Sequence, residues 1–225
     1  LLKVLTAIEG HFRIRILYSY PKHFTNELIE FIGTDPKICK YVDIPLQHVH
    51  DDLLRSMRRP DRRADIERLI DKLRAVMPDI AIRTTFIVGL PGESEEHYQE
   101  LRTFVEEKRI DHVGVFQYSP EEGTDAAGFG DQVPEEIKEE RYNDLMAVQA
   151  GISEEINRAA EGKEYEALIE GHDAEDSTLG YGRTEREAPD IDGTVYIENA
   201  GDVAVGEFVS VRILQGFCYD RMAEV

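Results

Sequence analysis

Four apolar runs of this sequence each end in polar, turn-forming residues of the kind that bind ligands. With their polar tips, the runs cover residues 14–21, 41–48, 82–93 and 113–120. A stretch with helical period follows each run, and this repeated order is typical of a parallel β/α sheet. Such sheets carry their chemistry at the carboxyl ends of the strands. We therefore expect the four tips to converge on one face, which is the candidate active site.

The third tip, residues 89–93 (Gly-Leu-Pro-Gly-Glu), lies where a strand turns into a helix. Glycines at such a turn allow the backbone to approach a ligand closely, and Glu93 could accept hydrogen bonds from ribose hydroxyls or an amine. A triphosphate is disfavoured because Glu93, Glu95 and Glu96 crowd the helix start and the Lys-Ser/Thr of a P-loop is absent. A plain strand-to-helix turn is the alternative.

Polar side chains of the second and third runs need partners, because parallel strands are buried on both faces. Arg83, within the third run, is met either by a ligand or by Asp43 of the second. Gln47 is expected to point into the cleft. His48 and His50 could ligate a metal, but no third ligand is visible, so we interpret them as loop residues.

Other chemistries receive weaker support. Ser119 lacks a Gly-x-Ser-x-Gly context, which argues against acyl transfer, and nothing fixes the separation that glycoside chemistry would need between Glu93 and Glu121. The only basic cluster is either a solvated helix end or an anion site at the cleft rim. Its members are Arg55, Arg58, Arg59, Arg62 and Arg63.

Composition narrows the class of protein. The chain has 225 residues, 41% of them hydrophobic, with a net charge of −20 and two cysteines, Cys39 and Cys218, that form no CxxC pair. No apolar run reaches the length of a membrane span and no secretory pattern opens the chain, so a reduced, cytoplasmic protein is expected. An acidic surface repels phosphate backbones and favours basic partners, although it can also serve solubility alone.

The elements that would position the tips can be predicted from periodicity and turn signals. Residues 1–10 are typical of a helix tail closed by Gly10, as in a fragment of a longer chain. The predicted strands cover residues 13–18, 41–45, 80–88 and 113–118. The predicted helices cover residues 25–32, 51–57, 63–77, 95–108 and 134–160, with a functional-looking loop at 121–133.

After residue 162 the pattern changes to short alternating runs separated by Gly, Asp and Asn. Five predicted strands, at residues 165–170, 179–183, 194–197, 207–214 and 217–221, indicate a small β-barrel. This segment, residues 163–225, holds five basic and fifteen acidic side chains, a net charge of −10. Small barrels often bind RNA through basic faces, and this one has the opposite sign.

Taken together, several segments resemble the methylthiotransferases, a radical S-adenosylmethionine family. They resemble in particular the RimO-type branch, which modifies an aspartate of a ribosomal protein. A serine-glycine-serine stretch, common after the glutamine in the tRNA-modifying MiaB-type branch, is replaced here by His48-Val49-His50. The segments, in the family's order, are YVDIPLQH (41–48), RTTFIVGLPGE (83–93), YSPEEGT (118–124), RYNDLM (141–146), APDIDG (188–193) and YDRMAEV (219–225).

The resemblance implies an α/β fold, a partial (β/α)6 TIM-like barrel with strands three to six, followed by a TRAM-type β-barrel. The implied division is residues 1–133, 134–162 and 163–225. It also implies S-adenosylmethionine and two [4Fe-4S] clusters as cofactors. The family's CxxxCxxC motif is absent, so this chain is expected to contain no cluster ligand and no catalytic cysteine, to be inactive alone, and to lack ligands that belong upstream of Leu1.

The resemblance further implies which residues contact the cofactor or the target. Thr85 replaces the first glycine of the family's nucleoside-binding strand, and Arg58 or Arg59 would meet the methionyl carboxylate. The implied cofactor-binding residues are Gln47, Arg58, Arg83, Thr85, Ile87, Gly89, Gly92, Glu93 and Tyr118.

The implied partner is a basic protein of the small ribosomal subunit, with no membrane and no direct nucleic-acid partner. Three alternatives stay open. They are a tRNA methylthiotransferase, a module that only docks a basic protein, and an ordinary β/α-barrel lyase or isomerase.

Overall fold

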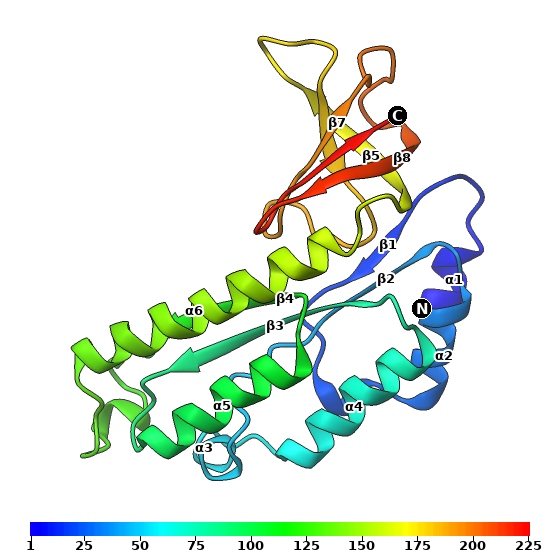
Figure 1. The fold of residues 1–225 in the computed structure, drawn as a ribbon. Helices are drawn as coiled ribbons and strands as arrows, with labels where there is room; N and C mark the ends of the chain where they lie inside the picture. Colours follow the sequence, from blue (N-terminus) through cyan, green and yellow to red (C-terminus); the bar gives the residue numbers. More distant parts are fainter. The chain divides into compact units, whose positions relative to one another are not determined.

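The computed structural model describes all 225 residues of the chain (Figure 1). The chain forms two compact units, each built from segments that are separated in the sequence. The first contains Leu1–Ile16, Ile32–Tyr41 and Ala150–Val225, and the second contains Leu17–Phe31 and Val42–Gln149.

Four strands form one sheet in the order β1-β2-β3-β4. Their bounds are Ile14–Ile16, Ile38–Asp43, Ala81–Val88 and His112–Gln117. Strands β3 and β4 pair in parallel, with Arg83 opposite His112 and Ile87 opposite Phe116. The predicted parallel β/α sheet is confirmed. As the pattern of strand and helical runs predicted, α4 (Arg63–Val76) connects β2 to β3, and α5 (Glu95–Lys108) connects β3 to β4.

Local sequence accounts for where the helices begin. At α5, the Ser94 hydroxyl accepts a hydrogen bond from the His97 N–H and so caps the start of the helix. The amino-terminal helix ends at Thr6 with Ala7 as its C-cap, so the role predicted for Gly10 is wrong. The remaining helices are α1 (Leu2–Thr6), η1 (Pro21–His23), α2 (Asn26–Thr34), α3 (Asp51–Ser56), η2 (Ala126–Gly128) and α6 (Glu135–Arg158).

The last third of the chain is a closed barrel with strand order β5-β6-β7-β9-β8, as predicted. In chain order, β5 to β9 are Glu164–His172, Gly180–Arg183, Val195–Glu198, Phe208–Gly216 and Arg221–Glu224. Inward-facing aliphatic side chains fill the barrel, among them Ile169, Ile197 and Ile213. The predicted fifth strand, residues 217–221, is misplaced, because β9 begins where that prediction ends.

Arg221 explains the error. It is the first residue of β9, is 1% exposed and forms an ion pair with Glu187. Burial lowers the pKa of Arg221 to about 10. A buried arginine is tolerated only with such a partner, and Glu187 lies far from it in the sequence.

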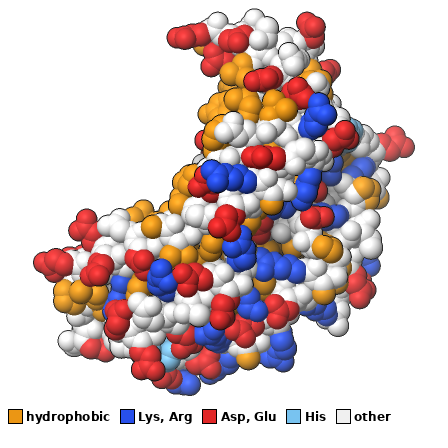
Figure 2. All heavy atoms as spheres, viewed as in Figure 1, with side chains coloured by type: hydrophobic (Ala, Val, Ile, Leu, Met, Phe, Trp, Pro, Cys, Tyr) orange, Lys and Arg blue, Asp and Glu red, His pale blue; other side chains and the backbone are white.

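No helix of the chain is both long and apolar enough to cross a membrane. Figure 2 shows acidic and basic side chains interspersed on the visible face.

Candidate functional site

Strand β3 presents two different faces. Ile82, Phe86 and Val88 are buried, and the Phe86 ring meets Phe104 of α5 edge-on at 6.3 Å between ring centroids. The alternate side chains are only half-buried, and they are Arg83, Thr85 and Ile87. Successive side chains of a strand point to opposite sides, so these three share one face. We call it the open face of β3.

The tips of the four strands lie beside one another. The Gln47 N–H donates to the Thr85 carbonyl at 2.8 Å, and the Ile87 N–H donates to the Gln47 carbonyl at 2.8 Å. On the other edge of β3, the Tyr118 N–H donates to the Val88 carbonyl at 2.9 Å. The tip of β1 is held against β2, because Asp43 accepts hydrogen bonds from the N–H groups of Tyr18 and Ser19. The backbone therefore holds Gln47, Thr85, Ile87 and Tyr118 in one neighbourhood.

Arg83 pairs with Asp43, one of the two partners predicted for it. Its Nη1 lies 3.1 Å from Oδ1 of Asp43, whose side chain is fully buried. The other carboxylate oxygen of Asp43 accepts from the Tyr18 N–H at 3.1 Å. Asp43 thus fixes the guanidinium at the base of the open face.

The turn at residues 89–93 is tied down by the protein itself. Both glycines have left-handed backbones, with φ of 75° at Gly89 and 79° at Gly92. A Cβ at Gly89 would lie 2.2 Å from Cγ of Lys138, and one at Gly92 would lie 2.7 Å from Oδ2 of Asp131. The close approach expected of a ligand is made here by two side chains of the same unit.

Glu93 is likewise engaged within the chain. Its carboxylate accepts from the Gly89 N–H at 2.9 Å and from Arg141 Nη1 at 2.7 Å, and the residue is 4% exposed. Burial raises the pKa of Glu93, and the Gly89 N–H and Arg141 oppose that shift. The Glu93 carboxylate therefore holds the backbone of the turn in place.

Two aromatic residues of the β4 tip contribute to the same region. The Tyr118 hydroxyl is buried and has no hydrogen-bond partner in the chain, while Lys138 Nζ binds the Tyr118 carbonyl at 3.0 Å. Phe116, opposite Ile87, is 59% exposed. Sequence reasoning missed Phe116, although its alternation with the buried Val113 and Val115 was the available signal.

His48 and His50 hold the loop after β2, as interpreted from the sequence. Nδ1 of His48 accepts from the His50 N–H at 2.9 Å, and the His50 ring caps α3 by accepting from the Asp52 N–H. Burial, together with nearby cationic groups, lowers the pKa of His48 to about 3, so its ring is neutral. Neutral His48 therefore carries its proton on Nε2.

The chain offers no ligand set for an iron–sulfur cluster. Cys39 is buried, Cys218 is half-buried, and no group of three His, Cys, Asp or Glu side chains could hold a metal ion. Burial raises the pKa of the Cys39 thiol, which disfavours the thiolate that a metal requires. The residues present do not fit such a cluster.

The arginines of the cluster have different partners. The Arg58 side chain is 83% exposed and pairs with Asp125 at 2.5 Å. Arg59 donates to the Pro45 carbonyl at 2.7 Å and lies 4.9 Å from the centre of the Tyr20 ring. The structure thus brings Arg59 to the second tip and leaves Arg58 at the surface with the 121–133 loop.

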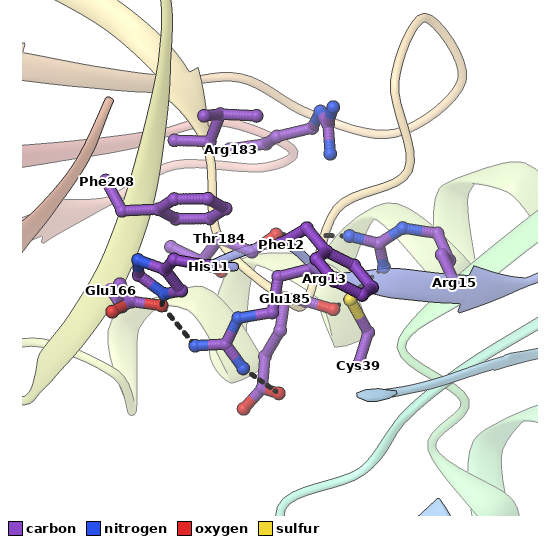
Figure 3. A pocket seen from close by; sticks show the side chains of 11 residues that line it. His11, Phe12, Arg13, Arg15, Cys39, Glu166, Arg183, Thr184, Glu185 and Phe208 are labelled. Atoms are coloured by element: carbon purple, nitrogen blue, oxygen red, sulfur yellow. Dashed lines mark hydrogen bonds and ion pairs between the residues drawn. The ribbon is translucent and has the colours of Figure 1, made fainter. Parts of the chain in front are cut away.

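A separate cavity of about 230 Å³ lies in the first unit (Figure 3). Arg13 pairs there with Glu166, and Arg15 donates to the Glu185 and Thr184 carbonyls at 2.8 and 3.1 Å, while its buried Nε has no hydrogen-bond partner. No sequence-predicted site residue lines it, so we regard it as part of the scaffold.

Comparison with known proteins shows which domains and proteins the chain is similar to. It matches the radical SAM superfamily over residues 2–105 and the TRAM domain over residues 162–225. It is 47% identical, over all of its residues, to the ribosomal protein uS12 methylthiotransferase RimO of Geobacter sulfurreducens. The protein of the same name from Heliobacterium modesticaldum is 50% identical over 98% of the chain. The chain therefore has a radical SAM region and a TRAM region, and over its whole length it is similar to ribosomal protein methylthiotransferases.

The chain spans about half the length of these curated relatives, 50% and 47% respectively. A solved structure, the radical SAM enzyme coproporphyrinogen III oxidase (HemN) of Escherichia coli, shares the fold. The similarity covers 90% of this chain and 46% of that one, with a TM-score of 0.51 and 15% identity. The resemblance and the fold class inferred from the sequence are confirmed.

Proposed function

We propose that this chain is part of a methylthiotransferase that adds a methylthio group to an aspartate of a small-subunit ribosomal protein. The observation that carries the proposal is 47% identity over the whole chain to relatives whose name states uS12 methylthiotransfer. The family's radical chemistry would proceed in the cytoplasm. For this chain we retain the division into residues 1–133, 134–162 and 163–225.

The open face of β3 and its neighbouring tips would hold S-adenosylmethionine and the target side chain. Half-buried Gln47, Thr85 and Ile87 and the unpartnered Tyr118 hydroxyl fit a nucleoside. When bound, this cofactor supplies the radical and the methyl group. The cation of Arg83, oriented by Asp43, suits a carboxylate such as that of the target aspartate.

The other sequence-predicted residues take supporting roles in this proposal. Gly89, Gly92 and Glu93 hold the turn at the rim of the open face, through Lys138 and Arg141. Arg58 remains a candidate for the methionyl carboxylate, and it would have to leave Asp125 to reach it. The two [4Fe-4S] clusters would depend on residues other than these 225, and this chain alone would be inactive.

Charge favours a basic protein over tRNA as the target. The chain carries a net charge of −20, and affinity for nucleic acid comes largely from cations that neutralise phosphates. Asp and Glu side chains instead attract lysine and arginine of a ribosomal protein.

The test uses an enzyme extended to the full length of its relatives, reconstituted anaerobically with iron and sulfide. Mass spectrometry should find a methylthio group on an aspartate of the small-subunit protein, and Arg83→Met should abolish it. Arg68→Met is the matched control, because Arg68 is exposed on α4 and pairs only locally with Asp65. Methylthiolated tRNA with an unmarked ribosomal protein would refute the proposal.

A further inference from the structure

The outer wall of the barrel carries a row of large side chains that crosses three strands. In β6, β7 and β9 every second residue is buried, and the alternate positions face outward. Tyr181 is paired with Tyr196, and Tyr196 with Met222, in neighbouring strands. Side chains at paired positions lie next to one another, so these three form a continuous strip, the tyrosine row.

The tyrosine row is exposed. Tyr181 is 40% exposed and Tyr196 is 38% exposed, whereas the inward-facing Val195 and Ile197 are fully buried. Gly171 of β5 continues the row opposite Tyr181, and a Cβ there would lie 2.2 Å from the Tyr181 hydroxyl oxygen. The Tyr181 side chain therefore lies across the glycine, against the wall, rather than projecting into solvent.

On one side of the row the next positions are acidic, and on the other side the next outward residue of β6 is Arg183, which forms an ion pair with Glu170. Glu198 and Glu224 are the next outward residues of β7 and β9, and they are paired with each other in register. Glu164 follows across β8. The one basic side chain among them, Arg212, forms an ion pair with Glu224. On the visible face of the barrel in Figure 2, hydrophobic side chains likewise lie among carboxylates.

We propose that the tyrosine row and its acidic border bind a lysine- and arginine-rich segment of a protein partner. Cations of that segment would lie over the tyrosine rings, its aliphatic stems would contact Met222, and Glu198 would pair with a further cation. The occupant follows from charge, because this segment of the chain carries a net charge of −10. The proposal rests on the proposed function for the identity of the partner, a ribosomal protein.

The test is fluorescence anisotropy with a labelled lysine- and arginine-rich peptide and the 225-residue chain. The double variant Tyr181→Ser/Tyr196→Ser should weaken binding about tenfold, the loss of two exposed cation–π contacts. Tyr181→Phe/Tyr196→Phe should bind as the parent does. Tyr219→Ser is the matched control, since Tyr219 is 45% exposed on the same barrel but lies outside the row.

Unfolding curves for every variant separate lost contacts from lost folding. If the serine variant is unstable, Tyr181→Leu/Tyr196→Leu keeps the bulk, removes the rings, and should show the same loss. Unchanged peptide affinity in folded variants would overturn the proposal, as would tighter binding of a single-stranded RNA that depends on the same tyrosines. These outcomes are independent of methylthiotransfer, so either proposal can fail alone.

Discussion

His48 is a buried titratable residue, and its Nε2 lies 3.9 Å from Oε2 of the buried Glu93 carboxylate. Its side chain is fully buried, one ring nitrogen accepts a backbone N–H, and the other has no hydrogen-bond partner. Burial lowers its pKa to about 3 from the ordinary 6.5. The unfolded chain therefore binds a proton below pH 6.5 that the folded chain does not take up until far lower pH.

Stability should consequently fall as the pH falls from 6.5 to about 5, by up to about 1.4 kcal/mol per pH unit from His48 alone. His48→Asn keeps an acceptor for the His50 N–H and removes the titrating ring, so its pH dependence should be flatter. Urea unfolding at several pH values measures the pH dependence of stability for the parent chain and for His48→Asn. An unchanged slope in His48→Asn would contradict the assignment, and His23→Asn, at an exposed position, is the control.

Gly89 shows what single residues reveal before the structure is known and what they do not. Two glycines in a strand-to-helix turn predicted a close approach by a ligand, and in the structure side chains of the chain itself make that approach, to glycines with left-handed backbones. The groups that make the approach were not predictable, because Lys138 and Asp131 lie far along the chain from Gly89 and Gly92. The same holds for Glu93, whose partner Arg141 no local pattern identifies.

Gly89→Ala should destabilise the chain by about 3 kcal/mol, the combined cost of a left-handed alanine and of overlap with the Lys138 stem. Gly123→Ala isolates the backbone part, since Gly123 has φ of 83° and open space around it. It should cost about 1–2 kcal/mol. Denaturant midpoints give both values, and equal losses would show that Lys138 moves aside without cost.

At the scale of elements, a buried ion pair connects α6 to the turn between β3 and α5. Arg141 donates to the Glu93 carboxylate and carbonyl, at 2.7 and 3.1 Å, and both side chains are almost fully buried. The sequence predicted the α-helices and the strands of the first sheet, because periodicity and caps are local, and it did not predict the short helices η1 and η2. It misplaced the final barrel strand, because buried Arg221 has the appearance of a surface residue.

Arg141→Met should destabilise the chain by about 3–5 kcal/mol, because it leaves the Glu93 carboxylate buried without its cation. Adding Glu93→Gln removes that charge, so the double variant should recover part of the loss. Urea unfolding of the two single variants and the double variant forms a thermodynamic cycle. A coupling below about 0.5 kcal/mol would mean that the two side chains act independently.

At the scale of the whole molecule, charge is the property that selects partners. The sequence specifies it fully, with a net charge of −20, whereas the placement of the carboxylates needs the fold. Alternation along β7 and β9 brings Glu198 and Glu224 beside an exposed aromatic row. Local pattern alone does not align three strands, so the tyrosine row could not be predicted from the sequence.

Association of this chain with a basic protein or peptide should weaken steeply with salt. Exposed charges are screened over about 8 Å at physiological ionic strength, so long-range attraction by the acidic surface disappears first. Anisotropy titrations at rising KCl give the slope of affinity against salt.

Glu198→Gln should make that slope shallower, because it removes a carboxylate beside the tyrosine row. Glu96→Gln, exposed on α5, changes net charge equally and should alter the slope less. A slope that responds equally to both variants would mean that overall charge, rather than this face of the barrel, attracts the partner.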